Sequence, residues 1–162
     1  MKIYIKDRYW INNILNKKPD FYMGKEIISI YSSGDTSPFI DRFNILKLNF
    51  DDIVYPEVLS EKELNEVILF DEDMAKQIVE FAQKMNPKKL CFIHCDAGIS
   101  RSGAVGYVLN EYFNKKLENN ETDFNFFKNE NKHILPNDLV VKILKKSFEP
   151  LYYKLWKDAN NG

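Results

Sequence analysis

The sequence has little of several features that would point to particular classes of protein. Two cysteines in 162 residues exclude a disulfide-rich scaffold and indicate a reducing compartment. No stretch approaches 18 apolar residues, which excludes a membrane-spanning helix, and the start of the chain, MKIYIKDRYW, lacks the apolar run of a signal peptide. We therefore expect a cytoplasmic protein with no membrane partner.

The sequence also lacks an excess of charge of either sign. Lys and Arg number 23, Asp and Glu number 24, and both signs are mixed along the chain. This balance excludes the strongly basic surface that binds polyanions, so nucleic acid is not an expected partner. One of the two histidines, His133, has no Cys/His cluster near it, and we expect neither a metal site nor another cofactor.

The chain contains no internal repeat, low-complexity segment or linker, and its length suits a single domain over residues 1–162. Short apolar runs predict strands at residues 2–5, 26–31, 44–50 and 90–93, of which the first suits a sheet edge. Helical spacing of apolar residues predicts helices at residues 7–15, 71–85, 100–113 and 136–144, with a shorter one from residue 60 and a short helix or turn at 123–127. The alternation predicts an α/β three-layer sandwich, in which helices flank a central, mostly parallel sheet of four to five strands.

Three connecting segments carry more specific expectations. Residues 115–121 suit a charged connection, and Pro150 should interrupt the last helix before residues 151–156. The loop of residues 32–38 follows a strand, where ligands bind in α/β sheets, but an ordinary surface loop remains an equal alternative.

Residues 88–103 carry the clearest chemical signal. A buried strand leads into a loop that contains Gly98 and then into a helix that starts at Ser100. Converging backbone amides and the helix N-terminus make the centre of such a loop attractive to an anion. Arg101 lies in the first helical turn, where its guanidinium can bind two oxygens of a phosphate or sulfate.

Cys95 lies at the mouth of this loop, where the positive surroundings favour the nucleophilic thiolate. Ser102 can donate its hydroxyl to the sulfur, and His94 can order the loop through backbone carbonyls. The alternative, that Cys95 is a small buried apolar residue, does not account for an arginine at this spacing. Cys91 lies within the strand, too far along it for a disulfide with Cys95, and is expected in the core.

The string HCDAGISRSG resembles the His-Cys-x5-Arg-Ser/Thr signature of the cysteine-dependent protein tyrosine phosphatase superfamily, and its AGISRS portion is most similar to the dual-specificity branch. The resemblance extends over residues 25–147, including the Leu-Pro-Asn string that ends at Asn137, which is similar to the start of the helix behind the phosphate loop. It implies a phosphate-binding loop made of Cys95, Asp96, Ala97, Gly98, Ile99, Ser100 and Arg101.

The resemblance further implies an Asp that protonates the leaving group from a loop after a neighbouring strand. Asp51 and Asp52 follow the strand at 44–50. Asp52 matches the position of this acid better, and Asp51 is the alternative. The other interpretation is that both residues lie in a solvated turn or cap a helix and have no catalytic role. Their separation from Cys95 is longer than the family's usual spacing, whereas Asp71 and Asp73 fall short of it. An insertion at residues 54–70 would account for the difference and could shape a lid.

The function implied is that of a protein phosphatase acting on phosphotyrosine, with or without phosphoserine and phosphothreonine, through a cysteinyl-phosphate intermediate. The partner is then a phosphorylated protein or peptide, and the oligomeric state is left open. Two alternatives remain: the same chemistry on a phosphoinositide or an RNA 5′-phosphate, which the acidic Asp96 disfavours, and a phosphate-binding pseudophosphatase, which normally lacks the cysteine or the arginine.

Overall fold

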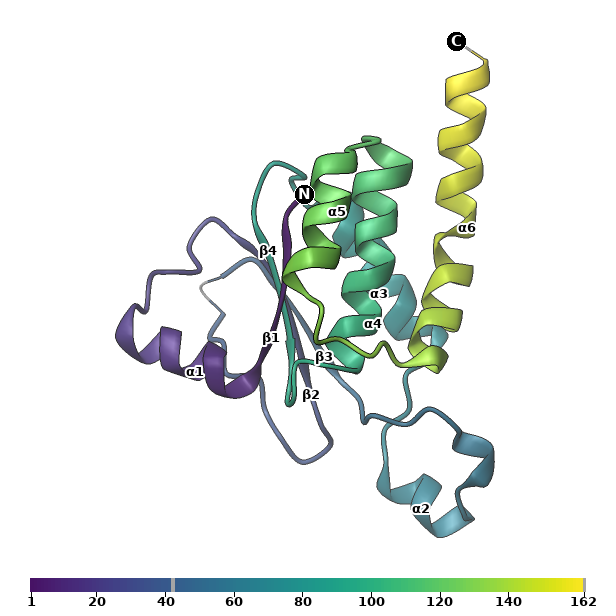
Figure 1. Ribbon diagram of the computed structural model, residues 1–162. Coiled ribbons are helices and arrows are strands. Elements are labelled where there is room, and N and C mark those ends of the chain that lie inside the picture. The colour runs from purple at the N-terminus through teal and green to yellow at the C-terminus, as the bar shows by residue number, and fades with distance from the viewer. Residues whose placement is uncertain (42, 162) are drawn as a thin grey trace.

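The structure is a computed structural model that describes residues 1–41 and 43–161. Its sheet has four strands, all parallel, in the order β1-β4-β2-β3 (Figure 1). The strands are β1 (Ile3–Asp7), β2 (Glu26–Tyr31), β3 (Ile45–Asn49) and β4 (Cys91–Cys95). The predicted α/β sandwich with a parallel sheet is confirmed, as is the edge position of the first strand. Parallel pairing also brings the C-terminal ends of all four strands to one edge of the sheet.

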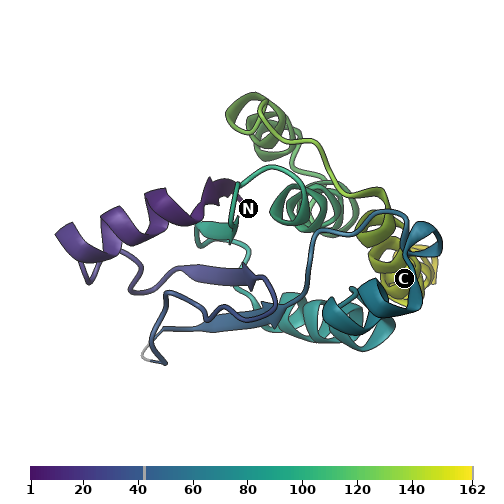
Figure 2. The ribbon, with the colours of Figure 1, turned by 90° about the horizontal axis from the view of Figure 1, so that it is seen from below.

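Helices connect the strands and follow the last one. They are α1 (Arg8–Lys17), α2 (Glu61–Glu66), α3 (Glu72–Lys84), α4 (Arg101–Glu111), α5 (Glu121–Glu130) and α6 (Asp138–Asn160), with a 3-10 helix η1 (Pro56–Val58) and a π-helix η2 (Tyr112–Leu117). In Figures 1 and 2, α1 lies on one side of the sheet and α3 to α6 lie on the other.

Alternating side chains of the strands fill a separate apolar core on each side of the sheet. In β4, Cys91 and Ile93 belong to the larger core, together with buried side chains of α3, α4 and α6. Phe92 belongs to the smaller core, which includes Ile11 of α1 and the buried Tyr22. The burial of Cys91 confirms its predicted place in the core, and Cys91 and Cys95 are both free thiols.

The last helix differs from the prediction, because α6 continues through Pro150 without a break. Proline removes one backbone donor and crowds the preceding turn, which usually ends or kinks a helix. Here Phe148 before the proline and Leu151 and Leu155 after it all pack on the larger core. This packing on both sides of Pro150 accounts for the continuity of the helix.

The predicted charged connection at residues 115–121 is shorter than expected, because residues 115–117 belong to η2 and Glu121 begins α5. Lys115 and Lys116 lie over the rings of Phe124 and Tyr152, so these charged side chains cover aromatic surface. The short helix expected at residues 123–127 is longer at both ends and forms α5.

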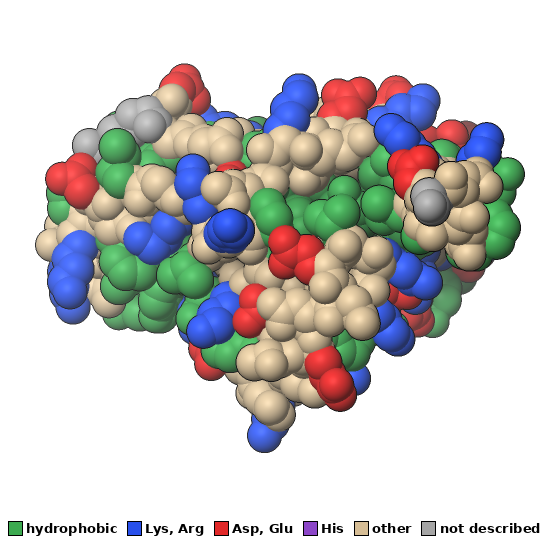
Figure 3. Space-filling model, turned by 90° about the horizontal axis from the view of Figure 1, so that it is seen from above, with side chains coloured by type: hydrophobic (Ala, Val, Ile, Leu, Met, Phe, Trp, Pro, Cys, Tyr) green, Lys and Arg blue, Asp and Glu red, His purple; other side chains and the backbone are tan. Residues whose placement is uncertain are grey.

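An excursion over residues 52–67 leaves the edge formed by the strand C-termini and carries α2 away from the sheet (Figure 1). Ser60 and Glu63 form a capping box at the start of α2, the short helix predicted from residue 60, so this helix has a local cause. No helix within residues 1–41 and 43–161 is both long and apolar enough to cross a membrane. On the face in Figure 3, acidic and basic side chains are interspersed, as the composition predicts.

Candidate active site

The loop between β4 and α4 is shaped by its contact with the end of β1. Gly98 has φ +66°, and a Cβ atom there would lie 2.6 Å from backbone atoms of Lys6 and Asp7. The residue after β1, Arg8 at the start of α1, donates its backbone N–H to the carbonyl of Asp96 at 3.1 Å. The loop therefore requires glycine for two reasons, its left-handed backbone conformation and the close approach of another chain segment.

Cys95 is the last residue of β4 and lies at the floor of this loop, with 2% of its surface exposed. Its Sγ lies 3.1 Å from Oγ of Ser102, a fully buried residue in the first turn of α4. The short turn from strand to helix thus places the Ser102 hydroxyl against the sulfur, where it can stabilise a thiolate by hydrogen bonding.

The Arg101 guanidinium is held by three groups and is 5% exposed. Its Nη1 donates to Oγ of Ser32 at 2.9 Å and to the carbonyl of Phe50 at 2.8 Å, while Nη2 donates to Oδ2 of Asp96 at 2.8 Å. Nε is buried and has no hydrogen-bond partner within the described chain. Because Nη2 carries a second proton, the Nε and Nη2 edge remains able to bind two oxygens of an anion.

Asp96 connects this arginine to a second one. Its Oδ2 also accepts a hydrogen bond from Oγ of Ser32 at 2.6 Å, and its Oδ1 lies 3.8 Å from Nη1 of Arg8. Partial burial opposes ionisation of Asp96, but the hydrogen bonds from Ser32 and Arg101 and the charges of both arginines outweigh it and lower the pKa of the carboxyl. Asp96 therefore stays negatively charged and fixes one edge of Arg101.

His94 points to the opposite side of the sheet from Cys95. It is paired in register with Ser29 of β2, and its Nε2 lies 2.7 Å from the Ser29 hydroxyl, while its Nδ1 lies 3.4 Å from the carbonyl of Cys95. Burial lowers the pKa of His94 to about 4, so the ring is neutral at physiological pH. His94 thus contacts one carbonyl of the loop, as expected, but its shorter contact is with the neighbouring strand.

Asp51 closes the base of the excursion. Its Oδ1 accepts from the backbone N–H of Ser33 at 3.0 Å, its Oδ2 from that of Ile68 at 2.8 Å, and its own N–H donates to the Ile68 carbonyl. Partial burial raises the pKa of Asp51, but these hydrogen bonds and the charge of Arg101 lower it by more, so the carboxyl is held in the ionised form.

Asp52 lies against the loop between β4 and α4. Its Oδ1 accepts from Oγ of Ser100 at 2.7 Å and from Nδ2 of Asn137 at 2.8 Å, and the backbone N–H of Asn137 donates to the carbonyl of Ser100. The Oδ2 atom of Asp52 receives none of the hydrogen bonds found among the described residues. By contrast, Asp71 caps the N-terminus of α3, and the neighbouring acidic residues belong to that helix start.

Three groups at this site were not predicted to take part. The Ser32 hydroxyl and the Phe50 carbonyl hold Arg101, and the Asn137 amide holds Asp52. Ser32 begins the loop that the sequence left open between a surface loop and a substrate rim. Asn137 was recognisable from sequence only as the start of the last helix, where it does cap α6 through the N–H of Val140.

Comparison with solved structures shows which fold contains this site. The structure of DUSP15 matches with a TM-score of 0.57 and 16% sequence identity, covering 96% of this chain and 90% of the other. Human DUSP28 matches with a TM-score of 0.53 and 14% identity, covering 94% of each chain. PTPMT1 in complex with PI(5)P matches with a TM-score of 0.52 and 12% identity, covering 98% of this chain and 94% of the other. The chain has the dual-specificity phosphatase fold.

This dual-specificity phosphatase fold agrees with the superfamily suggested by residues 94–103. No family model matches the sequence. Two curated proteins do, DNA ligases from two strains of Ureaplasma parvum serovar 3, with 24% identity over 140 residues, 82% of this chain and 20% of each ligase. The chain thus spans a fifth of the length of these relatives, so their name assigns no role to the site.

Proposed function

We propose that the protein is a protein phosphatase that hydrolyses phosphotyrosine, with or without phosphoserine and phosphothreonine, through a cysteinyl-phosphate intermediate. One observation carries the proposal: the Sγ of Cys95 lies at hydrogen-bonding distance from Ser102, beside Arg101, whose buried Nε has no hydrogen-bond partner among the described residues. A phosphate would supply both the electrophile for the sulfur and the acceptor for the guanidinium.

In the first step, the thiolate of Cys95 attacks phosphorus, an S–P bond forms and the bond from phosphorus to the substrate oxygen breaks. Arg101 stabilises the charge on the equatorial oxygens through Nε and Nη2. The leaving oxygen takes a proton from Asp52, whose place against Ser100 of the loop supports this role. The products are the dephosphorylated alcohol or phenol and the phosphorylated cysteine.

In the second step, water attacks phosphorus, its proton passes to the Asp52 carboxylate, and the S–P bond breaks. The products are inorganic phosphate and the thiolate, which the Ser102 hydroxyl stabilises as it leaves. The cycle restores the starting protonation of both residues and requires no other reactant.

Two observations bear on the substrate. The ionised Asp96 beside Arg101 adds negative charge to the loop, which favours a phosphomonoester on a protein over a polyphosphorylated lipid or RNA. The neighbour solved with PI(5)P keeps a phosphoinositide as the alternative. A phosphotyrosine peptide, PI(5)P and a 5′-phosphorylated RNA should therefore be compared as substrates, and we expect the peptide to have the highest kcat/KM.

The nucleophile is tested by Cys95→Ser, with Cys91→Ala as a control that alters the other thiol of β4. With p-nitrophenyl phosphate and EDTA, Cys95→Ser should lose at least about a thousandfold in kcat, whereas the control should keep its activity. Vanadate should still bind Cys95→Ser, because Arg101 and the loop amides remain. An active Cys95→Ser enzyme would contradict the proposal, and a wild-type protein without activity from about pH 5 to 8 would favour the pseudophosphatase.

The acid is tested by Asp52→Asn against the adjacent Asp51→Asn. Asp52→Asn should reduce kcat strongly for phosphotyrosine or alkyl phosphates, but much less for an ester with an activated leaving group that needs little protonation. Asp51→Asn should lower stability, because Asp51 closes the excursion, without changing the dependence on the leaving group. The same dependence in Asp51→Asn would reassign the acid.

A further inference from the structure

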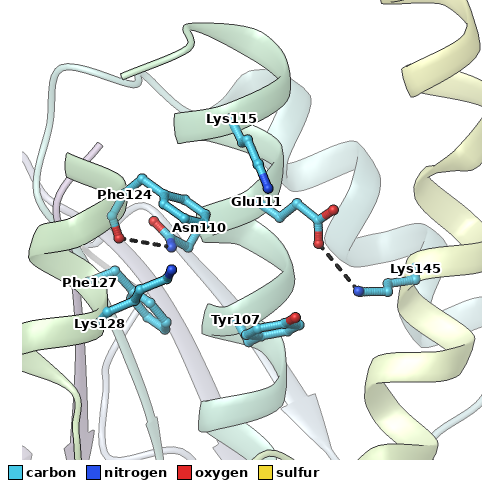
Figure 4. A pocket seen from close by; sticks show the side chains of 8 residues that line it. All are labelled: Tyr107, Asn110, Glu111, Lys115, Phe124, Phe127, Lys128 and Lys145. Carbon is cyan, nitrogen blue, oxygen red and sulfur yellow. Dashed lines mark hydrogen bonds and ion pairs between the residues drawn. The ribbon is translucent and has the colours of Figure 1, made fainter. Parts of the chain in front are cut away.

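A cavity of about 150 Å³ lies on the helical side of the molecule, where α4, η2, α5 and α6 meet (Figure 4). It is lined by Tyr107, Asn110, Glu111, Lys115, Phe124, Phe127, Lys128 and Lys145. Tyr107 is six residues beyond Arg101 along α4, which places it about 9 Å from Arg101 along the helix axis. None of these side chains has a role in the proposed hydrolysis.

Positive charge gathers at this cavity. Lysine side chains from η2, α5 and α6 point into the same space (Figure 4). The Nζ atoms of Lys115 and Lys128 lie 5.3 Å and 4.5 Å from the ring centroid of Phe124, and neither forms an ion pair with an acidic side chain among the described residues. The acidic residue of the lining, Glu111, forms an ion pair with Lys145 at 3.4 Å rather than with Lys115 or Lys128. The cavity therefore carries two ammonium charges that no acidic side chain neutralises.

Apart from the Tyr107 hydroxyl, the rest of the lining is apolar or internally satisfied. The buried amide of Asn110 donates to the carbonyl of Phe124 at 3.3 Å and accepts from Nδ2 of Asn114. The remaining surface comes from the rings of Tyr107, Phe124 and Phe127. The polar groups left to meet a ligand are thus the lysine ammonium groups and the Tyr107 hydroxyl, beside aromatic rings.

The backbone at this cavity is also unusual. Lys115 belongs to η2, a π-helix that directly continues α4, and π-helical turns are rare and frequent at functional sites. A second cavity, of about 310 Å³, shares Lys115, Phe124 and Lys128 with the first. Lys115 and Lys128 therefore line both cavities, and Glu121 also lines the second.

We propose that this cavity binds a small organic anion. Its carboxylate or phosphate group would lie between Lys115 and Lys128, and a flat apolar body would pack against Phe124 and Tyr107. A ligand with both parts is required, because the ammonium groups attract the anion and the rings bury the apolar body.

The proposal can be tested by NMR titration of the isotopically labelled full chain. The probes are 4-fluorobenzoate and 4-fluorophenylphosphonate, with 4-fluorobenzamide as the neutral analogue and tungstate present to occupy the phosphate loop. We expect at least one anionic probe to bind with a Kd of about 10 mM or less and to shift the amide resonances of Tyr107, Asn110 and Phe124, and the neutral probe to bind at least about tenfold more weakly. The stronger of the two anions identifies the preferred acidic group.

Variants separate this site from general attraction to a lysine-rich surface. Lys115→Gln with Lys128→Gln should weaken anion binding at least about tenfold. Lys116→Gln is the matched control, because Lys116 also belongs to η2 and covers a ring, that of Tyr152, but does not line the cavity. It should bind as the wild type does. Equal binding of the neutral probe, equal loss in Lys116→Gln, or no shift at the three amides of the wild type would overturn the proposal.

Discussion

The burial of His94 makes the stability of this protein depend on pH in a narrow and predictable range. The pKa of His94 falls from 6.5 to about 4, first because burial disfavours its charged form and further because of the charges of Arg8 and Arg101. The hydrogen bond to the Cys95 carbonyl and the charge of Asp96 act in the opposite direction and are weaker. His94 also lies beside Phe39, with 5.8 Å between the two ring centroids, and contacts the Ser29 hydroxyl.

The direction in which stability changes with pH follows from proton binding. Between about pH 4 and 6.5 the unfolded chain binds a proton at this histidine and the folded chain does not, so stability falls as pH decreases through that range. The full difference amounts to about 3 kcal/mol, at about 1.4 kcal/mol for each pH unit between the two pKa values. About 2 kcal/mol of this should already be lost on going from pH 7.5 to pH 5.

The assay is urea unfolding at about pH 7.5 and pH 5 for the wild type, His94→Gln and His133→Gln. Gln at position 94 can still hydrogen-bond Ser29 but does not titrate, so His94→Gln should lose much less stability between the two pH values. His133 is exposed, and His133→Gln should behave as the wild type does. The lowered pKa values of Asp51 and Asp96 affect stability only in more acidic solution, as these carboxylates become protonated. An equal loss in His94→Gln and the wild type would refute the reasoning.

The phosphate loop allows two more predictions. Gly98→Ala should abolish measurable activity, because the added Cβ would lie 2.6 Å from the β1 backbone. The control is Gly34→Ala, at a residue that also has positive φ but has open space around it; this variant should lose about 1 kcal/mol of stability and keep its kcat. Unchanged kcat in Gly98→Ala would contradict the packing described. Asn in Asp96→Asn can keep the hydrogen bond to Arg101 but carries no charge. Vanadate should therefore inhibit this variant about fivefold more strongly than the wild type, a gain of about 1 kcal/mol in binding free energy. Unchanged or weaker inhibition would mean that the charge of Asp96 does not oppose the anion.

The strands and the phosphate loop could be predicted because their causes are local. An apolar run, a glycine and a small-residue helix start occupy residues 90–103 without interruption, so the positions of Cys95, Arg101 and Ser102 follow from neighbours in sequence. The caps at Asp7 and Ser60 are local in the same way, because each accepts a hydrogen bond from the backbone N–H three residues on.

The groups that hold the site could not be predicted, because they come from distant parts of the chain. Arg101 is fixed by Ser32 and by the Phe50 carbonyl, 69 and 51 residues earlier. A serine in a polar loop and a backbone carbonyl carry no signal of this role. Pro150 is the opposite case: the local rule that proline ends a helix was wrong, because packing of residues on both sides outweighed it.

Asp51 and Asp52 show most directly what sequence leaves undecided. They are adjacent, identical in type and follow the same strand, so the sequence could rank them only by resemblance. In the structure, the excursion returns to Asp51 and engages both of its carboxylate oxygens with backbone N–H groups. The following residue points to the phosphate loop, where Ser100 and Asn137 contact one oxygen of Asp52. Because hydrogen bonds from these two backbone N–H groups help to lower the pKa of Asp51, the excursion that lengthens the spacing to Cys95 also distinguishes the two acids, and Asp52 is the one whose carboxylate lies against the loop between β4 and α4.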